Sequence, residues 1–380
     1  MDLTSLAASI VFKRIIAGML DYADCDVICP QTDAEMRHRV ELLPCPNYKR
    51  LPYRIEKKLQ DYQGYRISET WWAEYTFIKV KSAVIRGNYD AILSFIYAAN
   101  FAPLHLGDKI SRKANLPWIV YSVDAIPAPF PWWQENTIMR NKLYRHLNNY
   151  IPKATAFFSA NPTMLQYEKN IFTQFNGYSG VLLTPCDGDA IQDYVPEHHD
   201  HITFLYTGSI YGPRRVDALL AGFEEYQKKN PTARLVFLGK SKASDFAGYE
   251  KLLDSNIIEL HDFTTKVEYY FKHADVLIDL NADAKNDVFL SSKVCNYLSY
   301  NKPIIAISQD GSPVRAMMSN IESIIHSHHS VSEISHAMEK ATVMVGQPIT
   351  DREVIRREFM PKEVAKRFCK ELEALVGNYK

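Results

Sequence analysis

The stretch DVFLSSKVCNYLSYNKP, residues 287–303, decides the fold, because it joins two apolar runs through a short helical segment. VLIDL precedes it at 276–280 and IIAI follows at 304–307, which predicts strand, loop, a helix of about ten residues, and strand. The loop holds Ser291, Ser292 and Lys293 where it opens onto the helix. Backbone N–H groups, two hydroxyls and one cation at one point suit a diphosphate. The alternative is an ordinary turn in which a serine caps the helix.

Length and charge limit the class of protein. The chain has 380 residues, which indicates two domains of roughly 150–200 residues each. Its formal net charge is zero, so no overall field favours nucleic acid.

The N-terminal segment and the cysteines indicate a compartment. The sequence at 4–21 has helical spacing interrupted by Lys13 and Arg14, which predicts an amphipathic helix packed inside a domain, not a signal peptide. The six cysteines are scattered without a paired CxxC spacing, which predicts reduced thiols and a cytoplasmic protein.

Residues 1–186 are predicted to form an N-terminal α/β domain. Short apolar strands alternate with helices of 10–18 residues, a pattern typical of parallel sheets. The predicted strands lie at 26–29, 91–96, 117–121, 155–159 and 181–185, and the longest helix lies at 68–86.

Residues 187–201 are polar and aperiodic, which predicts a linker. The alternation repeats more clearly over 202–360, where six strands predict a doubly wound Rossmann-like sheet with helices that include one at 245–254. A last amphipathic helix, 361–380, is expected to return to the first domain. Two such domains would face each other across a cleft, with ligands at the carboxyl ends of the strands.

The second half resembles a known family. TGSIYGPRRVDALLAGFEEY, ARLVFLGK, FKHADVLIDLN and FLSSKVCNYLSYNKPIIAI follow one another in the order seen in GT-B glycosyltransferases of glycosyltransferase family 4. This resemblance covers about 200–345, and the first domain is similar more loosely. It implies a GT-B fold, meaning two Rossmann-like α/β domains facing across a cleft.

The resemblance implies a site for a nucleotide-diphosphate sugar. A strand ending in glycine and a cation at the start of the next helix hold the diphosphate in this family. Gly208 and Arg215 match those places, with Arg214 as the competing choice, and Lys293 matches the lysine of the later S-K-x-x-E-Y-L motif. The donor-binding residues are then expected to be Gly208, Ser209, Arg214, Gly239, Phe263, Ser291, Ser292 and Asn296.

Two departures from the family pattern stand out. Asn296 replaces the usual glutamate that accepts ribose hydroxyls, and the earlier glutamate of the pair falls near Val288, beside Asp287. The family also opens with a strand and a glycine-rich loop, whereas this sequence starts at a segment that resembles the helix after them. Either the sequence is a shortened form or the domain lacks that strand.

The acceptor side is expected in the first domain. Asp124, in PWIVYSVDAIPAPFPWW, matches the acidic position of the family and would serve as hydrogen-bond partner or base for the incoming hydroxyl. Its alternative is an aspartate that closes a turn. Trp132 and Trp133 on the following loop could stack on a sugar or lipid, while burial is expected for at least one of them.

The predicted function is transfer of a sugar from a nucleotide-diphosphate donor to a hydroxyl of a glycan or lipid-linked glycan, as in surface polysaccharide synthesis. The family resemblance implies retention at the anomeric carbon. Arg215, Lys293 and Asp124 are the predicted catalytic residues. No metal and no cofactor are expected, and DGD at 187–189 is interpreted as a turn. Peripheral contact with the inner face of the membrane stays open, and the oligomeric state is not predicted.

Two alternatives share the architecture. A sugar-nucleotide epimerase would need carboxylates converging on the sugar, and Asn296 argues against it. A catalytically decayed transferase acting as a glycan-binding subunit would explain both departures together.

Overall fold

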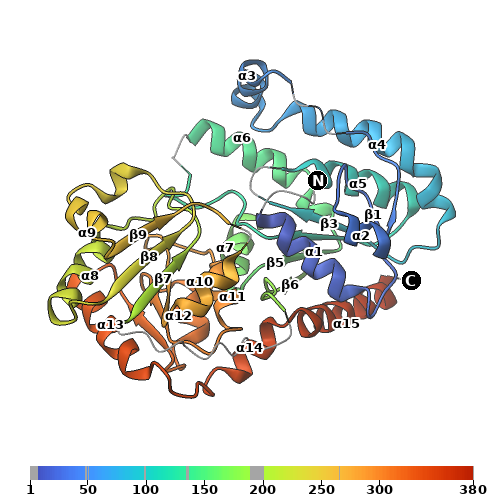
Figure 1. Cartoon of the computed structure of the whole chain (residues 1–380). Helices are drawn as coiled ribbons and strands as arrows, with labels where there is room; N and C mark the ends of the chain where they lie inside the picture. The colour runs from blue at the N-terminus through green and yellow to red at the C-terminus, as the bar shows by residue number, and fades with distance from the viewer. Residues whose placement is uncertain are drawn as a thin grey trace. The chain divides into compact units, whose positions relative to one another are not determined.

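The computed structural model describes residues 7–47, 49, 51–97, 100–133, 137–188, 201–264 and 266–379. They form two compact units: Met1–Pro185 with Met360–Lys380, and Cys186–Phe359 (Figure 1). The predicted linker from 189 to 200, and residues 4–6 of the first predicted helix, lie outside the described residues. The units are described one at a time.

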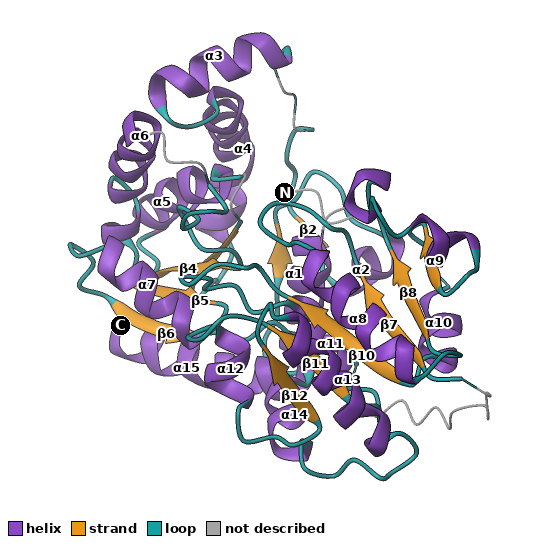
Figure 2. Ribbon diagram, turned by 90° about the vertical axis from the view of Figure 1, so that its left-hand side faces the viewer, coloured by secondary structure: helices purple, strands orange, loops and turns teal. Residues whose placement is uncertain are grey.

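The second unit is built on a six-stranded parallel sheet with the strand order β12–β11–β10–β7–β8–β9. Its strands carry continuous buried apolar residues because helices cover both faces (Figure 2). The predicted α/β alternation and six strands are confirmed. The strands are β7 (Thr203–Thr207), β8 (Arg234–Leu238), β9 (Ile258–His261), β10 (Val276–Leu280), β11 (Ile304–Ile307) and β12 (Ile324–Ser327).

The strand order reverses between β7 and β10. From β7 the chain proceeds outward to β8 and β9, then returns to place β10 on the other side of β7. In open parallel sheets, ligands bind at the carboxyl ends of the two strands between which the order reverses. The helices of this unit are α8 (Asp217–Lys229), α9 (Glu250–Asp254), α10 (Val267–His273), α11 (Ser292–Tyr297), α12 (Pro313–Met318), α13 (Val331–Met344) and α14 (Glu353–Phe359).

The first unit contains a four-stranded parallel sheet in the order β3–β4–β5–β6 and a separate two-stranded parallel pair, β1–β2. The strands are β1 (Asp26–Val27), β2 (Glu41–Leu42), β3 (Ile92–Ile96), β4 (Trp118–Ser122), β5 (Ala156–Ser159) and β6 (Tyr178–Val181). The helices are α1 (Ala7–Met19), α2 (Ala34–Arg39), α3 (Tyr53–Gln63), α4 (Ile67–Arg86), α5 (Ala102–Ala114), α6 (Thr137–Asn148), α7 (Pro162–Ile171) and α15 (Pro361–Tyr379).

The C-terminal helix α15 packs against α1 within the first unit. Gly18 makes the close approach possible, because a Cβ at this position would lie 2.8 Å from the Pro361 carbonyl oxygen and 2.9 Å from the Ala365 Cβ. The two helices, from opposite ends of the sequence, therefore form one layer over the sheet.

Three predicted elements need correction. The strand predicted at 181–185 lies at Tyr178–Val181, since Leu182 and Leu183 are buried without belonging to the strand. The helix predicted at 245–254 is a 3-10 turn followed by α9, because Gly248 adopts a left-handed φ of 92° between them. The helix of about ten residues after Ser291 is the six-residue α11.

A cavity of about 790 Å³ lies in the first unit between β1 and β3. Among the described helices, none is both long and apolar enough to cross a bilayer.

Candidate functional site

The donor-side loops of the second unit begin where β7 ends. Gly208 follows the strand with a φ of 106°, a left-handed conformation that glycine adopts without strain. The backbone N–H of Thr207 donates to the Tyr297 hydroxyl at 3.1 Å, and the side-chain hydroxyl oxygens of Thr207 and Tyr297 are 2.8 Å apart. Tyr206 donates its hydroxyl to the carbonyl of Ser209 at 3.1 Å. Hydrogen bonds of Thr207 and Ser209 with buried tyrosines thus hold the backbone on both sides of the predicted residue Gly208.

Gly239, after β8, is a packing position. It has a φ of 141°, and a Cβ there would lie 2.6 Å from the carbonyl oxygen of Gly208. Only glycine lets the two strand ends approach in this way. The predicted donor residue Gly239 therefore supports the Gly208 turn from behind.

Lys293 reaches the β7 end from the loop after β10. Ser291 caps α11 by accepting the Lys293 backbone N–H at 3.2 Å, which fixes the start of the helix. A Cβ on Gly208 would lie 3.3 Å from Lys293 Cδ and 3.6 Å from Nζ, and Nζ lies 5.3 Å from the centroid of the Tyr206 ring. The structure thus brings Gly208 and Lys293 together at the carboxyl ends of β7 and β10.

The electrostatics around Lys293 favour an anionic ligand. Burial and, to a smaller extent, the nearby Arg214 charge lower the pKa of Lys293 to about 8, against the opposing effect of the Asp279 carboxylate. Two cations close enough to depress a pKa repel each other unless an anion lies between them. This point of the second unit is therefore suited to phosphate.

The two adjacent arginines differ. Arg214 packs its guanidinium carbon 4.8 Å from the Tyr211 ring centroid and acts electrostatically on Lys293. The Arg215 side chain is 72 % exposed and pairs with Asp217 at 2.9 Å. The geometry favours Arg214, the competing choice from the sequence, as the partner of Lys293.

Asp279, near the end of β10, escaped the sequence reasoning. It is completely buried; one carboxylate oxygen accepts from the Asn281 amide at 2.8 Å, and the other has no hydrogen-bond partner among the described residues. A carboxylate this deep requires nearby positive charge, which Lys293 and Arg214 supply. The only sequence signal was an aspartate within the apolar run VLIDL.

The other residues predicted to bind the donor, together with Asp287, lie on three different segments: α11, the loop after β9 and the loop after β10. Ser292 is exposed and Asn296 is half-buried, both on α11, and Phe263 is 82 % exposed after β9. Asp287 is buried and accepts the Phe289 backbone N–H at 3.2 Å, so it shapes its own turn. The structure does not present Asp287 as a replacement for the family glutamate.

The acceptor-side residues of the first unit follow β4. Asp124 is half-buried, and its carbonyl accepts the Ser122 hydroxyl at 2.5 Å. Trp133 packs against the core of this unit, while Trp132 is half-buried. The structure places Asp124 and both tryptophans on one loop.

Glu168, on α7, holds that loop and was not predicted. It is completely buried; one oxygen accepts the Ile126 backbone N–H at 3.2 Å, and the other accepts the Ser159 hydroxyl. The neighbouring Tyr167 donates its hydroxyl to the carbonyl of Pro127 at 2.7 Å. One turn of α7 therefore ties the loop after β4 to the end of β5.

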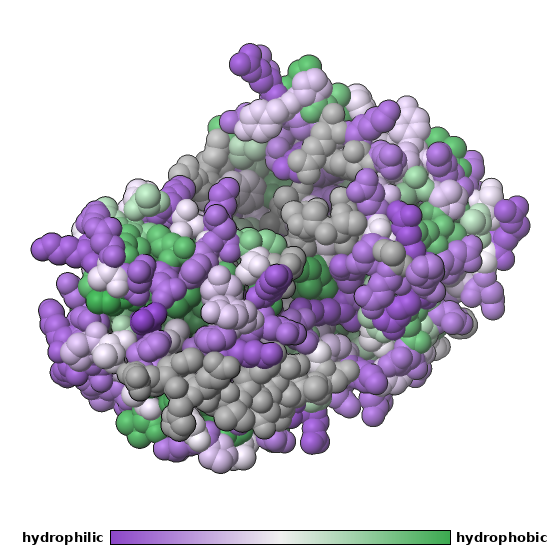
Figure 3. Space-filling model, in the orientation of Figure 1, coloured by the Kyte–Doolittle hydropathy of each residue, from purple (hydrophilic) through white to green (hydrophobic). Residues whose placement is uncertain are grey.

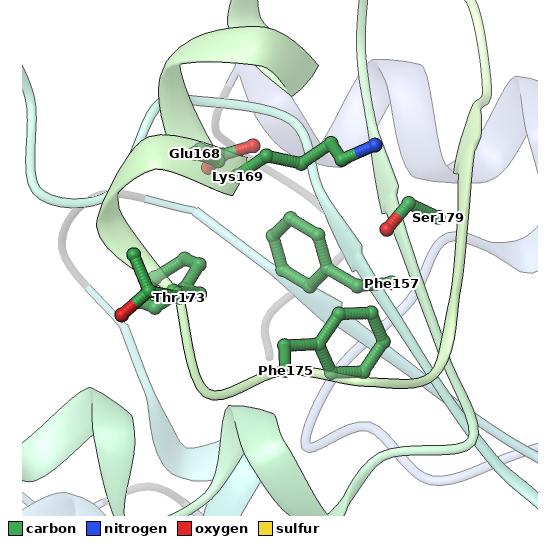
Figure 4. A pocket seen from close by; sticks show the side chains of 7 residues that line it. Phe157, Glu168, Lys169, Thr173, Phe175 and Ser179 are labelled. Atoms are coloured by element: carbon green, nitrogen blue, oxygen red, sulfur yellow. The ribbon is translucent and has the colours of Figure 1, made fainter.

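Burial raises the pKa of Glu168 to about 8, although hydrogen bonds from Ser159 and Ile126 oppose the rise. Glu168 also borders a cavity of about 90 Å³ with Lys169 (Figure 4). Figure 4 shows both side chains leaving α7 above the rings of Phe157 and Phe175. The cavity is too small for a sugar, so the importance of Glu168 lies in the loop it holds.

Comparison with known proteins identifies the fold. No family model matches the sequence, and no curated protein matches it. Among solved structures, HepE from Anabaena in complex with UDP and glucose superposes with a TM-score of 0.60 at 13 % identity, covering 97 % of this chain and 96 % of that one. A glycosyltransferase from Rickettsia africae gives 0.66 at 10 % identity, covering 99 % and 97 %.

A third structure agrees. Sucrose-phosphate synthase from Thermosynechococcus elongatus gives a TM-score of 0.59 at 12 % identity, covering 98 % of this chain and 92 % of that one. The protein therefore has the GT-B fold, an α/β architecture of two Rossmann-like domains. At these identities the similarity establishes the fold, and the function has to be argued from the residues.

Proposed function

We propose that this protein is a retaining, metal-independent glycosyltransferase of the family 4 type. It would move a hexosyl group from a nucleotide-diphosphate donor to a hydroxyl of a glycan or lipid-linked glycan, in the cytoplasm. The observation that carries the proposal is the placement of Lys293 beside Gly208, with Arg214 near enough to depress the pKa of Lys293. The UDP complex of HepE supports UDP as the first nucleotide to test.

The proposed mechanism is mainly electrostatic. Negative charge grows on the diphosphate as the glycosidic bond breaks, and cations fixed in place beforehand stabilise it. Lys293 and Arg214 would fill that role, with backbone N–H groups at the start of α11 and after β7 binding phosphate oxygens. Asp124 would accept a hydrogen bond from the acceptor hydroxyl, and Glu168 would keep the Asp124 loop in place.

The test is a titration with UDP, GDP, dTDP and CDP sugars, followed by assays of free nucleotide with and without a glycan acceptor. Binding with acceptor-dependent nucleotide release is the expected result. Isomerised sugar without release would instead identify an epimerase. Failure to bind any of the nucleotides would favour the decayed binding subunit, for which Asn296 gives some support.

A peripheral membrane contact is part of the proposal, and the outer face of α4 supports it. Trp71, Tyr75, Ile78 and Ile85 recur at helical spacing and are each 48–64 % exposed, opposite the face that packs on α5. Figure 3 shows hydrophobic residues among hydrophilic ones over α3 and α4. Exposed cations flank this stripe at Lys79, Lys81 and Arg86.

Aromatic and aliphatic side chains flanked by cations suit an anionic lipid surface. We expect the protein to sediment with phosphatidylcholine vesicles only when they contain phosphatidylglycerol. Replacing both Trp71 and Tyr75 by serine should weaken this binding several-fold, whereas Val354→Ser, on an exposed site of the second unit, should not. Equal binding to neutral vesicles would remove the electrostatic part of the proposal.

A further inference from the structure

Asp279 occupies an uncommon place for a carboxylate, inside the buried strand β10. Its neighbours Ile278 and Leu280 belong to the hydrophobic core on one face of the sheet. Because side chains alternate along a strand, the Asp279 side chain emerges on the other face. It is completely buried there, and among the described residues only one of its two oxygens has a hydrogen-bond partner, the Asn281 amide at 2.8 Å. A buried carboxylate oxygen without a partner is destabilising, so its retention calls for a role.

The neighbouring strand β7 places Thr207 beside Asp279. Tyr206 and Ile278 are partners in the parallel register of β7 and β10. One residue further along each strand, Thr207 and Asp279 are therefore level with each other and point to the same face. The hydroxyl oxygen of Thr207 lies 2.8 Å from that of Tyr297 on α11. This contact locates α11 over the pair formed by Thr207 and Asp279.

The same side of α11 carries Lys293. Lys293 and Tyr297 are four residues apart in the helix, so their side chains leave it on one side. The Lys293 side chain ends beside Gly208, since its Nζ would lie 3.6 Å from a Cβ on that glycine. The register and the helix thus bring the Lys293 ammonium to the level of Asp279, close enough for the carboxylate to raise the pKa of Lys293 against the effect of burial.

The two opposite charges are close without forming a direct bond. In the part of the chain that the structure describes, the Lys293 ammonium and the second oxygen of Asp279 each make no hydrogen bond. Attraction between them therefore keeps the ammonium in place without using its three N–H donors. A ligand that reaches Gly208 finds the ammonium both positioned and able to donate.

We propose that Asp279 is a positioning residue of the donor site: its carboxylate is the counter-ion that keeps the Lys293 ammonium beside Gly208 until a diphosphate binds there. The inference rests on the proposed function, because it takes the ligand to be the diphosphate of a nucleotide sugar. A diphosphate carries more negative charge than one carboxylate and can accept hydrogen bonds from the ammonium directly. It therefore replaces Asp279 as the main partner of Lys293, while Asp279 stays buried below.

The first measurement needs no ligand. The protein is labelled with 13C- and 15N-lysine, the Lys293 signal is assigned by its loss in Lys293→Arg, and its titration is followed by NMR. Asp279→Asn removes the attraction of a neighbouring carboxylate, so we expect the pKa of Lys293 to fall from about 8 by about one unit or more. Asp283→Asn is the matched control, an exposed carboxylate on the loop after the same strand, and should leave the titration unchanged. An unchanged titration in Asp279→Asn would overturn the proposal.

The second measurement follows the affinity for UDP by calorimetric titration across the pH range in which Lys293 titrates. The midpoint of the fall in affinity should move to lower pH in Asp279→Asn, by about as much as the Lys293 titration moves. A purely structural role of Asp279 would lower the stability of the protein and leave this midpoint in place. UDP binding with an unchanged midpoint in Asp279→Asn therefore contradicts the proposal.

Asp279→Leu covers the case in which Asp279→Asn fails to fold. Leucine continues the apolar run VLIDL, and replacing a buried charge by an apolar side chain is often neutral or stabilising. We expect the same shifts of the Lys293 titration and of the UDP midpoint, and their absence in a folded Asp279→Leu protein would overturn the proposal. If the unmodified protein binds no UDP while Lys293 still responds to Asp279→Asn, the proposed function fails and the pairing of Asp279 with Lys293 stands.

Discussion

The two units end their parallel sheets with opposite charges. In the second unit, the loops after β7 and β10 carry Arg214 and Lys293 beside a glycine turn. In the first unit, the loop after β4 carries Asp124 and is held by the buried carboxyl of Glu168. Under the proposed function, one copy of the fold type would bind the anionic donor and the other the acceptor hydroxyl. The difference lies in the loops, since both sheets are parallel and similarly covered.

The largest expected effect is on stability and concerns Glu168, on the carboxylate side of this comparison. Burial raises the pKa of Glu168 from 4.5 in the unfolded chain to about 8 in the fold. Between these values the unfolded state loses its proton while the folded state keeps it, so stability must fall as pH rises. We expect a loss on the order of 3–5 kcal/mol across that range, measured by guanidinium unfolding.

Glu168→Gln should remove this slope, because glutamine cannot ionise and still accepts the Ile126 N–H. The exposed Glu224→Gln on α8 should keep the slope of the unmodified protein. A flat profile for the unmodified protein would mean that Glu168 is ionised in the fold. The charge of Glu168 would then add to the carboxylate side of the comparison.

The next largest effect is on nucleotide release and concerns Lys293, on the cation side of this comparison. Lys293→Met keeps the length and apolar contacts of the side chain but removes its charge. We expect nucleotide release from UDP-glucose to fall about 100- to 1000-fold, as when one preorganised group that stabilises transition-state charge is lost. The affinity for UDP should also depend on pH, weakening above about pH 8 as the Lys293 ammonium loses its proton.

Lys293→Arg provides the matched control. A guanidinium stays charged throughout this range, so the loss of affinity above about pH 8 should disappear even if tight binding is reduced. Unchanged release by Lys293→Met, with the variant folded, would place the donor elsewhere.

The sequence predicted more of the second unit than of the first for a physical reason. Buried parallel strands and their helices leave strong periodic patterns, so six strands could be placed, and the loop with Ser291 and Lys293 followed from position alone. Gly248 shows the limit of these periodic patterns. They predict one continuous helix at 245–254, but the left-handed backbone of Gly248 divides it into two elements.

The site residues that sequence reasoning missed are both buried carboxylates. Asp279 is marked in the sequence only by its apolar neighbours in VLIDL, and nothing marks Glu168, which lies on an ordinary amphipathic helix. Their importance comes from partners far along the chain, such as Ile126 for Glu168 and Lys293 for Asp279. Only the fold brings those partners together.

The smallest effect separates two adjacent arginines, which the sequence could not do. Outside a regular helix, neighbouring side chains point in different directions, and here Arg214 turns toward Lys293 while Arg215 meets Asp217 in solvent. An exposed ion pair such as Arg215–Asp217 contributes only about 0–1 kcal/mol to stability. It nevertheless leaves Arg215 bound to a carboxylate and not to phosphate. We expect Arg214→Ala to weaken UDP binding about tenfold, about 1.4 kcal/mol, and Arg215→Ala to weaken it less than about threefold. Calorimetric titration with UDP measures both.

A larger effect at Arg215 would require Asp217 to release the Arg215 side chain when the nucleotide binds. Asp217→Asn would then strengthen UDP binding, an increase that the Arg214 assignment does not predict.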